Sequence, residues 1–310
     1  MPYAPPLVTS VSVIVPTRDR PDHLARALAS IAAQHRPVSE VIVVDDGSTR
    51  PVDPILDRTA IGDRVTVVRH AEPRGAAAAR NTGLDVARGD VIAFLDDDDE
   101  WMPAKVARQV DVLEGDPDVG LVGGQAIVVS GEREILSRSV DRCTFDDLLW
   151  FNVVGSTSFA MWHRHRLPVE PRFDPTMEAN QDWHVWLQAA AQSGIAIVAE
   201  PVCRYHDDSD LERISRSDQR RAAARTDLLE HWAHEMTPTC RTFHSLKQQL
   251  ETPRPFVREA GSLARAAGGS PRAALLVLGS ALAGRLGDRV GDPGRGGRAL
   301  LRMTRVLDRR

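Results

Sequence analysis

The stretch Val91–Trp101, "VIAFLDDDDEW", places five apolar residues directly before four aspartates and a glutamate. Its apolar part is typical of a buried strand, because short runs of Val, Ile, Phe and Leu occur in strands whose two faces are both covered. Adjacent carboxylates repel one another, so the acidic part is costly unless a positive group lies beside it. The run therefore forms either an acidic turn in solvent or part of a site that holds a cation.

Three more segments in the first third of the chain have the composition of buried strands, namely Val11–Pro16 "VSVIVP", Glu40–Asp46 "EVIVVDD" and Arg64–His70 "RVTVVRH". Sequences with helical periodicity or a high alanine content separate them, at residues 21–34 and 74–89. Strands that alternate with helices in this way form a parallel sheet covered by helices on both faces. The sequence predicts an α/β fold with a mostly parallel sheet.

The pattern is less regular after Trp101. We expect strands at residues 119–129, 156–163 and 195–201, and helices at residues 101–115 and 181–194. Beyond Asp218 the sequence is mainly helical and rich in Ala and Arg. This predicts a mainly helical C-terminal region after the α/β part.

The composition, with 42% hydrophobic and 26% charged residues among 310, is that of an ordinary soluble protein. A net charge of −4 argues against nucleic-acid binding that depends on overall charge. Cys143, Cys203 and Cys240 are too far apart for a zinc ribbon or a dense disulfide framework. The apolar segment 273–284 is too short to span a bilayer, and the N-terminus has no signal-peptide pattern. We expect a cytoplasmic protein, either soluble or peripheral at the inner face of the membrane.

Polar residues follow three of the predicted strands at the point where each strand ends. These are Thr17 and Arg18, then Asp45 and Asp46, and then the run 96–99. Ligands of open α/β sheets bind beyond the carboxyl ends of the strands, so these side chains should meet at one edge. Carboxylate oxygens suit Mg²⁺ or Mn²⁺, which keeps coordination positions for substrate phosphates. The sequence "PTRDRP" after the first strand lacks the G-x-G-x-x-G of an NAD-binding domain, and the chain has no P-loop motif.

Four segments together resemble the family 2 inverting glycosyltransferases. They are "VSVIVPTRDRPDHLARALASIAAQ", "EVIVVDDGS", "RGAAAARNTGLDVARGDVIAFLDDDDEWMP" and "NQDWHVWLQAA", and the similarity extends from about Val11 to His206. The resemblance implies the Rossmann-like GT-A fold over residues 1–215, with a nucleotide-binding half at 1–100 and an acceptor-side half at 101–215. Residues 216–310 would form a helical C-terminal extension.

The resemblance also implies roles for individual residues on the donor side. The strand end with Pro16 and Thr17 would approach the nucleotide, and Asp46 would accept a hydrogen bond from its base. Arg80 would lie beside the nucleotide and diphosphate, although an exposed helix arginine is the alternative. The remaining positions match the Asp-x-Asp signature, with nucleotide-sugar contacts from Asp96 and Asp97 and a metal contact from Asp98. A register of Asp97-x-Asp99 is left open by the continuous run.

On the acceptor side, Asp182 matches the catalytic base of the family. Gln181 stands where the family usually has glutamate, and the alternative role for Asp182 is that of a helix N-cap. The segment "CRYHDDSDLERIS" resembles another family element with Cys203 in place of tyrosine, which makes His206 a candidate for the metal or diphosphate site. Trp183 and Trp186 are expected in the core, whereas residues 150, 151 and 162 could border an acceptor groove.

The implied reaction moves a sugar from a nucleotide-diphosphate donor to a hydroxyl of a glycan, a lipid-linked acceptor or a small molecule, with Mn²⁺ or Mg²⁺ as cofactor. The alternative is a catalytically inactive nucleotide-sugar-binding or scaffold protein, which would have no need of Asp182. A nucleotidyltransferase would need a Gly-rich loop after the first strand. The tail "GRALLRMTRVLDRR" predicts an amphipathic helix that packs on the main domain, forms a homodimer contact or lies on an anionic membrane.

Overall fold

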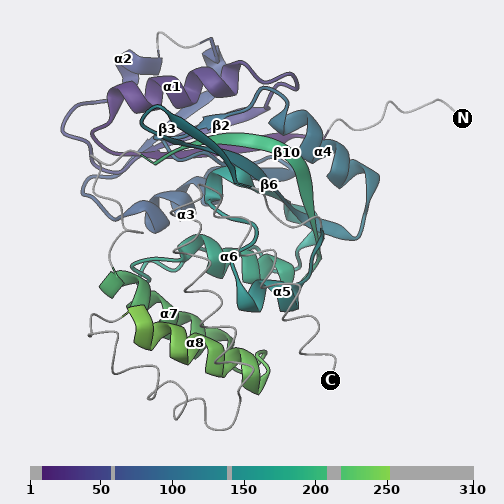
Figure 1. Cartoon of the computed structure of the whole chain (residues 1–310). Helices are drawn as coiled ribbons and strands as arrows, with labels where there is room; N and C mark the ends of the chain where they lie inside the picture. The colour runs from purple at the N-terminus through teal and green to yellow at the C-terminus, as the bar shows by residue number, and fades with distance from the viewer. Residues whose placement is uncertain (1–8, 57–59, 138–141, 208–217, 252–310) are drawn as a thin grey trace, which may run out of the picture.

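The computed structural model describes residues 9–56, 60–137, 142–207 and 218–251 (Figure 1). Its strands are β1 (Val11–Thr17), β2 (Glu40–Asp45), β3 (Val65–Arg69), β4 (Val91–Phe94), β5 (Glu100–Trp101), β6 (Val119–Ser130), β7 (Arg133–Ser137), β8 (Arg142–Cys143), β9 (Met161–His163) and β10 (Gly194–His206). Its α-helices are α1 (Pro21–Ala32), α2 (Asp53–Leu56), α3 (Ala76–Val86), α4 (Lys105–Gly115), α5 (Phe145–Trp150), α6 (Gln181–Ala190), α7 (Asp218–Trp232) and α8 (Pro238–Glu251). Three short 3₁₀ helices are η1 (Gly62–Arg64), η2 (Thr157–Phe159) and η3 (Arg164–Arg166).

All described strands belong to one sheet with the order β3-β2-β1-β4-β9-β6-β10-β5, to which β7 adds beside β6 and β8 beside β10. The four N-terminal strands β1 to β4 pair in parallel, and so do β6 and β10. The short strand β9 lies between these two groups and runs antiparallel to both β4 and β6. The predicted α/β fold with a mostly parallel sheet is confirmed.

The two faces of the sheet carry separate apolar layers, as the unbroken hydrophobic strands predict. Along β1, Val13 and Val15 pack with residues of α1 and α4, whereas Ile14 packs on the opposite face with residues of α3. Figure 1 shows α1 above the sheet, with α3, α5 and α6 below it and the α7–α8 pair farther down. Both faces are therefore buried, and the strand ends are left as the place for a ligand.

Helices α7 and α8 extend the lower layer. The ring of Phe243 lies 5.4 Å from that of Trp150 and 5.3 Å from that of Phe151, measured between centroids. The Nε2 of His244 donates to the carbonyl of Leu149 at 2.6 Å. The two helices thus continue the hydrophobic core that supports α5 and α6. Trp150 and Trp162 are buried in this core, so they do not border a groove as considered above, whereas Phe151 is only partly buried against it.

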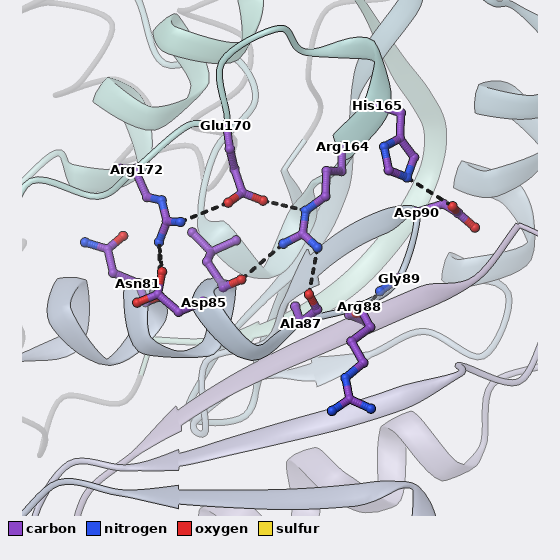
Figure 2. A network of polar contacts seen from close by, with 12 residues as sticks. Asn81, Asp85, Ala87, Arg88, Gly89, Asp90, Arg164, His165, Glu170 and Arg172 are labelled. Atoms are coloured by element: carbon purple, nitrogen blue, oxygen red, sulfur yellow. Dashed lines mark hydrogen bonds and ion pairs between the residues drawn. The ribbon is translucent and has the colours of Figure 1, made fainter.

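The connection from β9 to α6 is fastened to the C-terminal end of α3 by a polar network (Figure 2). Arg164 donates to the carbonyls of Ala87 at 2.7 Å and Leu84 at 3.1 Å and pairs with Glu170 at 2.6 Å. Arg172 bonds the second oxygen of Glu170 at 3.0 Å and also Asp85. These contacts hold the segment that leads to α6 against the helix that begins at the strand ends.

The elements of the second half differ from the prediction in detail. The expected strand 156–163 is a strand only in β9, because its first part forms the turn η2, whose Thr157 and Ser158 hydroxyls bind Asp96 and Asp99. The expected strand 195–201 is longer, since β10 continues to His206 beside β5 and β6.

Within the described part of the chain, no helix combines the length and apolar character needed to cross a bilayer. The apolar segment 273–284 and the amphipathic tail 297–310 lie outside the described residues.

Candidate functional site

A cleft of about 590 Å³ opens at the carboxyl ends of β1, β2 and β4. The start of α3, the loop after α5 and the start of α6 complete its wall. Of the nine site residues that the sequence predicts, eight line this cleft: Pro16, Thr17, Asp46, Arg80, Asp96, Asp97, Asp98 and Asp182. The convergence expected of parallel strand ends is therefore present.

The acidic run is not a solvated turn, because positive and hydroxyl groups surround it. Arg80 pairs with Asp96 at 2.5 Å, and Arg20 contacts both Asp97 at 3.2 Å and Asp98 at 3.5 Å. The hydroxyl of Thr17 donates to Asp97 at 2.7 Å. Burial nevertheless raises the pKa of Asp97 to about 6, against the opposing effects of that hydroxyl and of Arg20.

The surroundings of Asp99 differ from those of the three aspartates before it. Its side chain is fully buried, accepts the hydroxyl of Ser158 at 2.6 Å and accepts the backbone N–H of His206 at 3.2 Å. It does not line the cleft. The arrangement favours a signature read as Asp96-x-Asp98 over one read as Asp97-x-Asp99.

Asp46 joins the end of β2 to the start of α3. It accepts the backbone N–H groups of Arg74 and Gly75, both at 2.8 Å, and the Nδ1–H of His70 at 2.7 Å. Burial opposes its ionisation, but these donors outweigh burial and hold the pKa of Asp46 below its usual value. A carboxylate has about four acceptor positions, so Asp46 can still accept one further donor such as a base N–H.

Arg80 is 7% exposed, which excludes the alternative of an exposed helix arginine. Its guanidinium lies over the ring of Phe173 at 5.2 Å and donates to the Oε1 of Gln181 at 3.4 Å, in addition to its bond with Asp96. Its buried Nε has no hydrogen-bond partner in the part of the chain that the structure describes.

Asp182 lies at the second position of α6, and the N-cap of that helix is Asn180 in the left-handed conformation with φ 56°. The N-cap alternative for Asp182 is therefore wrong. One carboxylate oxygen accepts the N–H of Trp183 at 2.8 Å, and the other accepts the amide of Asn152 at 3.0 Å. Although the group is partly exposed at the cleft wall, desolvation raises the pKa of Asp182 to about 6, while its hydrogen bonds and the charge of Arg80 oppose that rise.

His206 is the predicted residue that the structure does not bring to the cleft. Its Nε2 donates to Glu100 at 2.7 Å, so the imidazole nitrogen is directed to a carboxylate of β5. The neighbouring Tyr205 lines the cleft instead. This geometry gives no support to a metal-ligand role for His206.

Sequence reasoning did not assign a role to four residues that shape the site. Arg20 follows the first strand and His70 ends the third, so the strand-end argument could have found both. Asn152 and Thr157 lie in irregular segments between short elements, where no periodic pattern gives a signal.

The residues of the cleft fit a divalent cation in charge and chemistry. Five aspartates and three arginines line it, which leaves a surplus of two negative charges when all are ionised. Among the described residues no three His, Cys, Asp or Glu side chains converge to hold an ion by themselves. Mg²⁺ and Mn²⁺ sites on nucleotide substrates commonly use one or two carboxylates with phosphate and water oxygens. Asp98, which lines the cleft, fits such a role.

A cleft at the strand ends of a mostly parallel sheet is the arrangement expected of a GT-A glycosyltransferase. The chain belongs to glycosyl transferase family 2, whose sequence profile matches residues 12–170, half of its 310 residues. It is similar to the putative teichuronic acid biosynthesis glycosyltransferase TuaG of Bacillus subtilis, with 30% identity over 57% of this chain and 70% of that protein. The family predicted from the four sequence segments is confirmed, and the protein is a glycosyltransferase.

Solved structures show the same fold. S. aureus TarS, residues 1–349, in complex with UDP-GlcNAc superposes with a TM-score of 0.65 at 16% identity, over 96% of this chain and 91% of that one. The mannosyltransferase PcManGT of Pyrobaculum calidifontis, in complex with GDP-Man and Mn²⁺, gives a TM-score of 0.59 at 22% identity, over 100% of this chain and 92% of that one. The predicted GT-A fold is confirmed.

Proposed function

We propose that this glycosyltransferase moves a sugar, with inversion, from a nucleotide-diphosphate donor to an acceptor hydroxyl, with Asp182 as general base. The observation that carries the proposal is that Asp182 faces the same cleft as Asp96, Asp97 and Asp98. A base on α6 and an acidic donor site after β4, both lining one cleft, suit a displacement between two substrates. The sugar nucleotides bound by TarS and PcManGT support the donor class.

The donor occupies the strand-end side of the cleft in this proposal. Pro16, Thr17 and Asp46 contact the nucleoside, since they lie where β1 and β2 end. Arg80 places its positive charge beside the diphosphate, while Asp96 and Asp97 contact the sugar or its diphosphate. Asp98 would hold Mn²⁺ or Mg²⁺, which supplies positive charge that stabilises the departing diphosphate.

The acceptor enters from the α6 side, where amide and hydroxyl groups predominate. As its hydroxyl oxygen bonds to the anomeric carbon, the bond from that carbon to the diphosphate oxygen breaks and its electron pair stays on the diphosphate. Asp182 takes the hydroxyl proton. Attack from the face opposite the leaving group inverts the anomeric configuration. A general base of this kind contributes roughly 10²- to 10⁴-fold to the rate. The similarity to TuaG supports a glycan as the acceptor.

The test is the Asp182→Asn variant, assayed for both donor binding and turnover. Nucleotide-diphosphate affinity by calorimetry should remain close to wild type, while kcat falls about 10²- to 10⁴-fold because the amide cannot take a proton. Asp85→Asn, which removes an exposed carboxylate of α3 outside the cleft, is the matched control and should keep full activity.

Turnover by Asp182→Asn at near wild-type rate would refute the base assignment. Proton NMR of the product formed by the wild-type protein tests inversion separately. A product that retains the anomeric configuration of its donor would refute the in-line mechanism.

A further inference from the structure

The amide of Asn152 has one orientation. Its Oδ1 accepts the backbone N–H of Gly155 at 2.9 Å, which identifies the NH₂ group as the other branch of the amide. That NH₂ donates to the Oδ2 of Asp182 at 3.0 Å and, at the longer distance of 3.4 Å, to the carbonyl of Gly155. A flipped amide would place its oxygen against the carboxylate and its NH₂ against an N–H, and both contacts would be repulsive.

The turn that carries Asn152 is bonded to α6 at a second point. The indole N–H of Trp186 donates to the carbonyl of Gly155 at 2.8 Å. Asp182 and Trp186 are four residues apart and lie on one face of the helix. Gly155 has φ +86°, and a Cβ there would lie 2.6 Å from the ring of Phe159, so glycine is required. Two hydrogen bonds therefore join the turn at residues 152–155 to α6, and one of them ends on the carboxylate of Asp182.

We propose that Asn152 is a positioning residue that orients the carboxylate of Asp182 toward the acceptor hydroxyl. The proposal rests on the function proposed above, in which Asp182 is the base. Asn152 occupies one lone pair of Oδ2 and the Trp183 N–H occupies one of Oδ1, which leaves one on each oxygen for the incoming proton.

A neutral donor suits this task better than a cation. The charged groups that act on Asp182 are Arg80 of α3, which favours its ionised form, and Asp96 after β4, which disfavours it. Arg80 is itself paired with Asp96. A second cation in place of Asn152 would hold the carboxylate but would also make it a weaker base, whereas an amide fixes the geometry at a smaller cost in basicity.

Two variants distinguish this role from that of a simple turn residue. Asn152→Asp keeps an oxygen to accept the N–H of Gly155 but places a carboxylate oxygen against Asp182. Asn152→Ala removes all of these side-chain contacts. If Asn152 only stabilised the turn, the Asp variant would be the milder one. If it positions the base, the Asp variant should be the more damaging, because two carboxylates would lie in contact.

We expect kcat to fall about 10-fold in Asn152→Ala and about 100-fold or more in Asn152→Asp, in line with the loss of a hydrogen bond to a charged group and with like-charge repulsion. The donor KM and the nucleotide-diphosphate Kd should change by less than about threefold, since a kcat effect alone reflects an interaction made in the transition state. The acidic limb of the rate profile should move to higher pH in both. The reverse order of the two variants, or an effect on donor binding alone, would overturn the proposal.

Thermal unfolding gives a measurement that does not depend on activity. Asn152→Asp should lower Tm at pH 7.5, and the swapped pair Asn152→Asp with Asp182→Asn should recover most of that loss, because the amide and the carboxylate exchange places. Failure of the swap to recover Tm would show that the contact is not the one described. Full activity of Asp182→Asn alone would instead refute the proposed function and leave the contact intact.

Discussion

The environment of Asp182 raises the pKa of its carboxyl, and this shift should be visible in the pH dependence of the reaction. Desolvation raises its pKa to about 6. A base must be ionised to accept a proton, so kcat/KM should be constant above about pH 7 and fall tenfold per unit well below pH 6. Rate profiles between pH 4.5 and 9 measure this, with Asp85→Asn as a control that should show the same limb. Constant activity down to pH 4.5 would contradict the assignment.

The raised pKa of Asp97 leads to a second prediction, which concerns the free energy of unfolding. Its pKa rises in the folded protein from the ordinary 3.8 to about 6, so between those values the native state binds more protons than the unfolded state. Stability must then fall as pH rises through this window. Asp97→Asn should be more stable than wild type by about 2 kcal/mol at pH 7.5, and the difference should vanish near pH 4. Urea unfolding at both values measures this, and an equal difference at the two would contradict it.

At the scale of single residues, the sequence predicts best where a regular strand ends. Thr17, Asp46 and Asp96 could be placed together because parallel strands finish at one edge of a sheet. Asn152 could not, because its position depends on a turn set by Gly155 and on the packing of α6, neither of which has a periodic signal. His206 lies outside the cleft for a related reason, since the longer β10 directs its ring to Glu100.

The helix α3, which carries Arg80, packs closely against β1 at Gly83. A Cβ at Gly83 would lie 2.4 Å from the Cγ2 of Ile14 in β1. Gly83→Ala should therefore destabilise the protein by about 1–3 kcal/mol, because α3 and β1 must move apart to admit the added methyl group. Gly115→Ala at the end of α4, where nothing lies within 4 Å, should be neutral or slightly stabilising. Chemical denaturation of both variants checks the contrast, and equal effects would contradict it.

The C-terminal end of α3 depends on Arg164, whose side chain binds the carbonyls of Leu84 and Ala87 and the carboxylate of Glu170 (Figure 2). Arg164→Met should cost about 1–3 kcal/mol, because it leaves partly buried acceptors without donors. Arg172→Met removes ion pairs of a side chain that is 43% exposed and should cost less than about 1 kcal/mol. Thermal or urea unfolding of the pair decides, and a larger loss in Arg172→Met would contradict this ranking.

Elements with strong periodicity were predictable, whereas short ones were not. The strands β1 to β4 and helices α1, α3, α4 and α6 follow runs or repeats that a sequence displays directly. The strand β9 has three residues, and α5 has six, so neither contains enough residues to establish a period. The 3₁₀ helix η2 between them is held by tertiary contacts, namely the bonds of Thr157 and Ser158 to the acidic run.

For the molecule as a whole, α7 and α8 behave as part of the core and not as an appendage. Phe243 is fully buried against the aromatic residues of the α5 region. Phe243→Ala should cost about 3–5 kcal/mol, whereas Thr242→Ala, one position earlier on the same helix, should cost less than about 1 kcal/mol. Both should unfold in one cooperative transition if α8 folds together with the sheet. A separate early transition in Phe243→Ala would show that residues 218–251 form an independent unit.

The antiparallel strand β9 has a consequence for how the polypeptide is made. The apolar strand β4 receives its second neighbour only when Met161–His163 has been synthesised, although the strands on its other side are complete long before. Until then a nascent chain on the ribosome presents an open, hydrophobic sheet edge of the kind that invites pairing with other chains. The three residues of β9 thus cover the open edge of β4 and connect the N-terminal strands to β6.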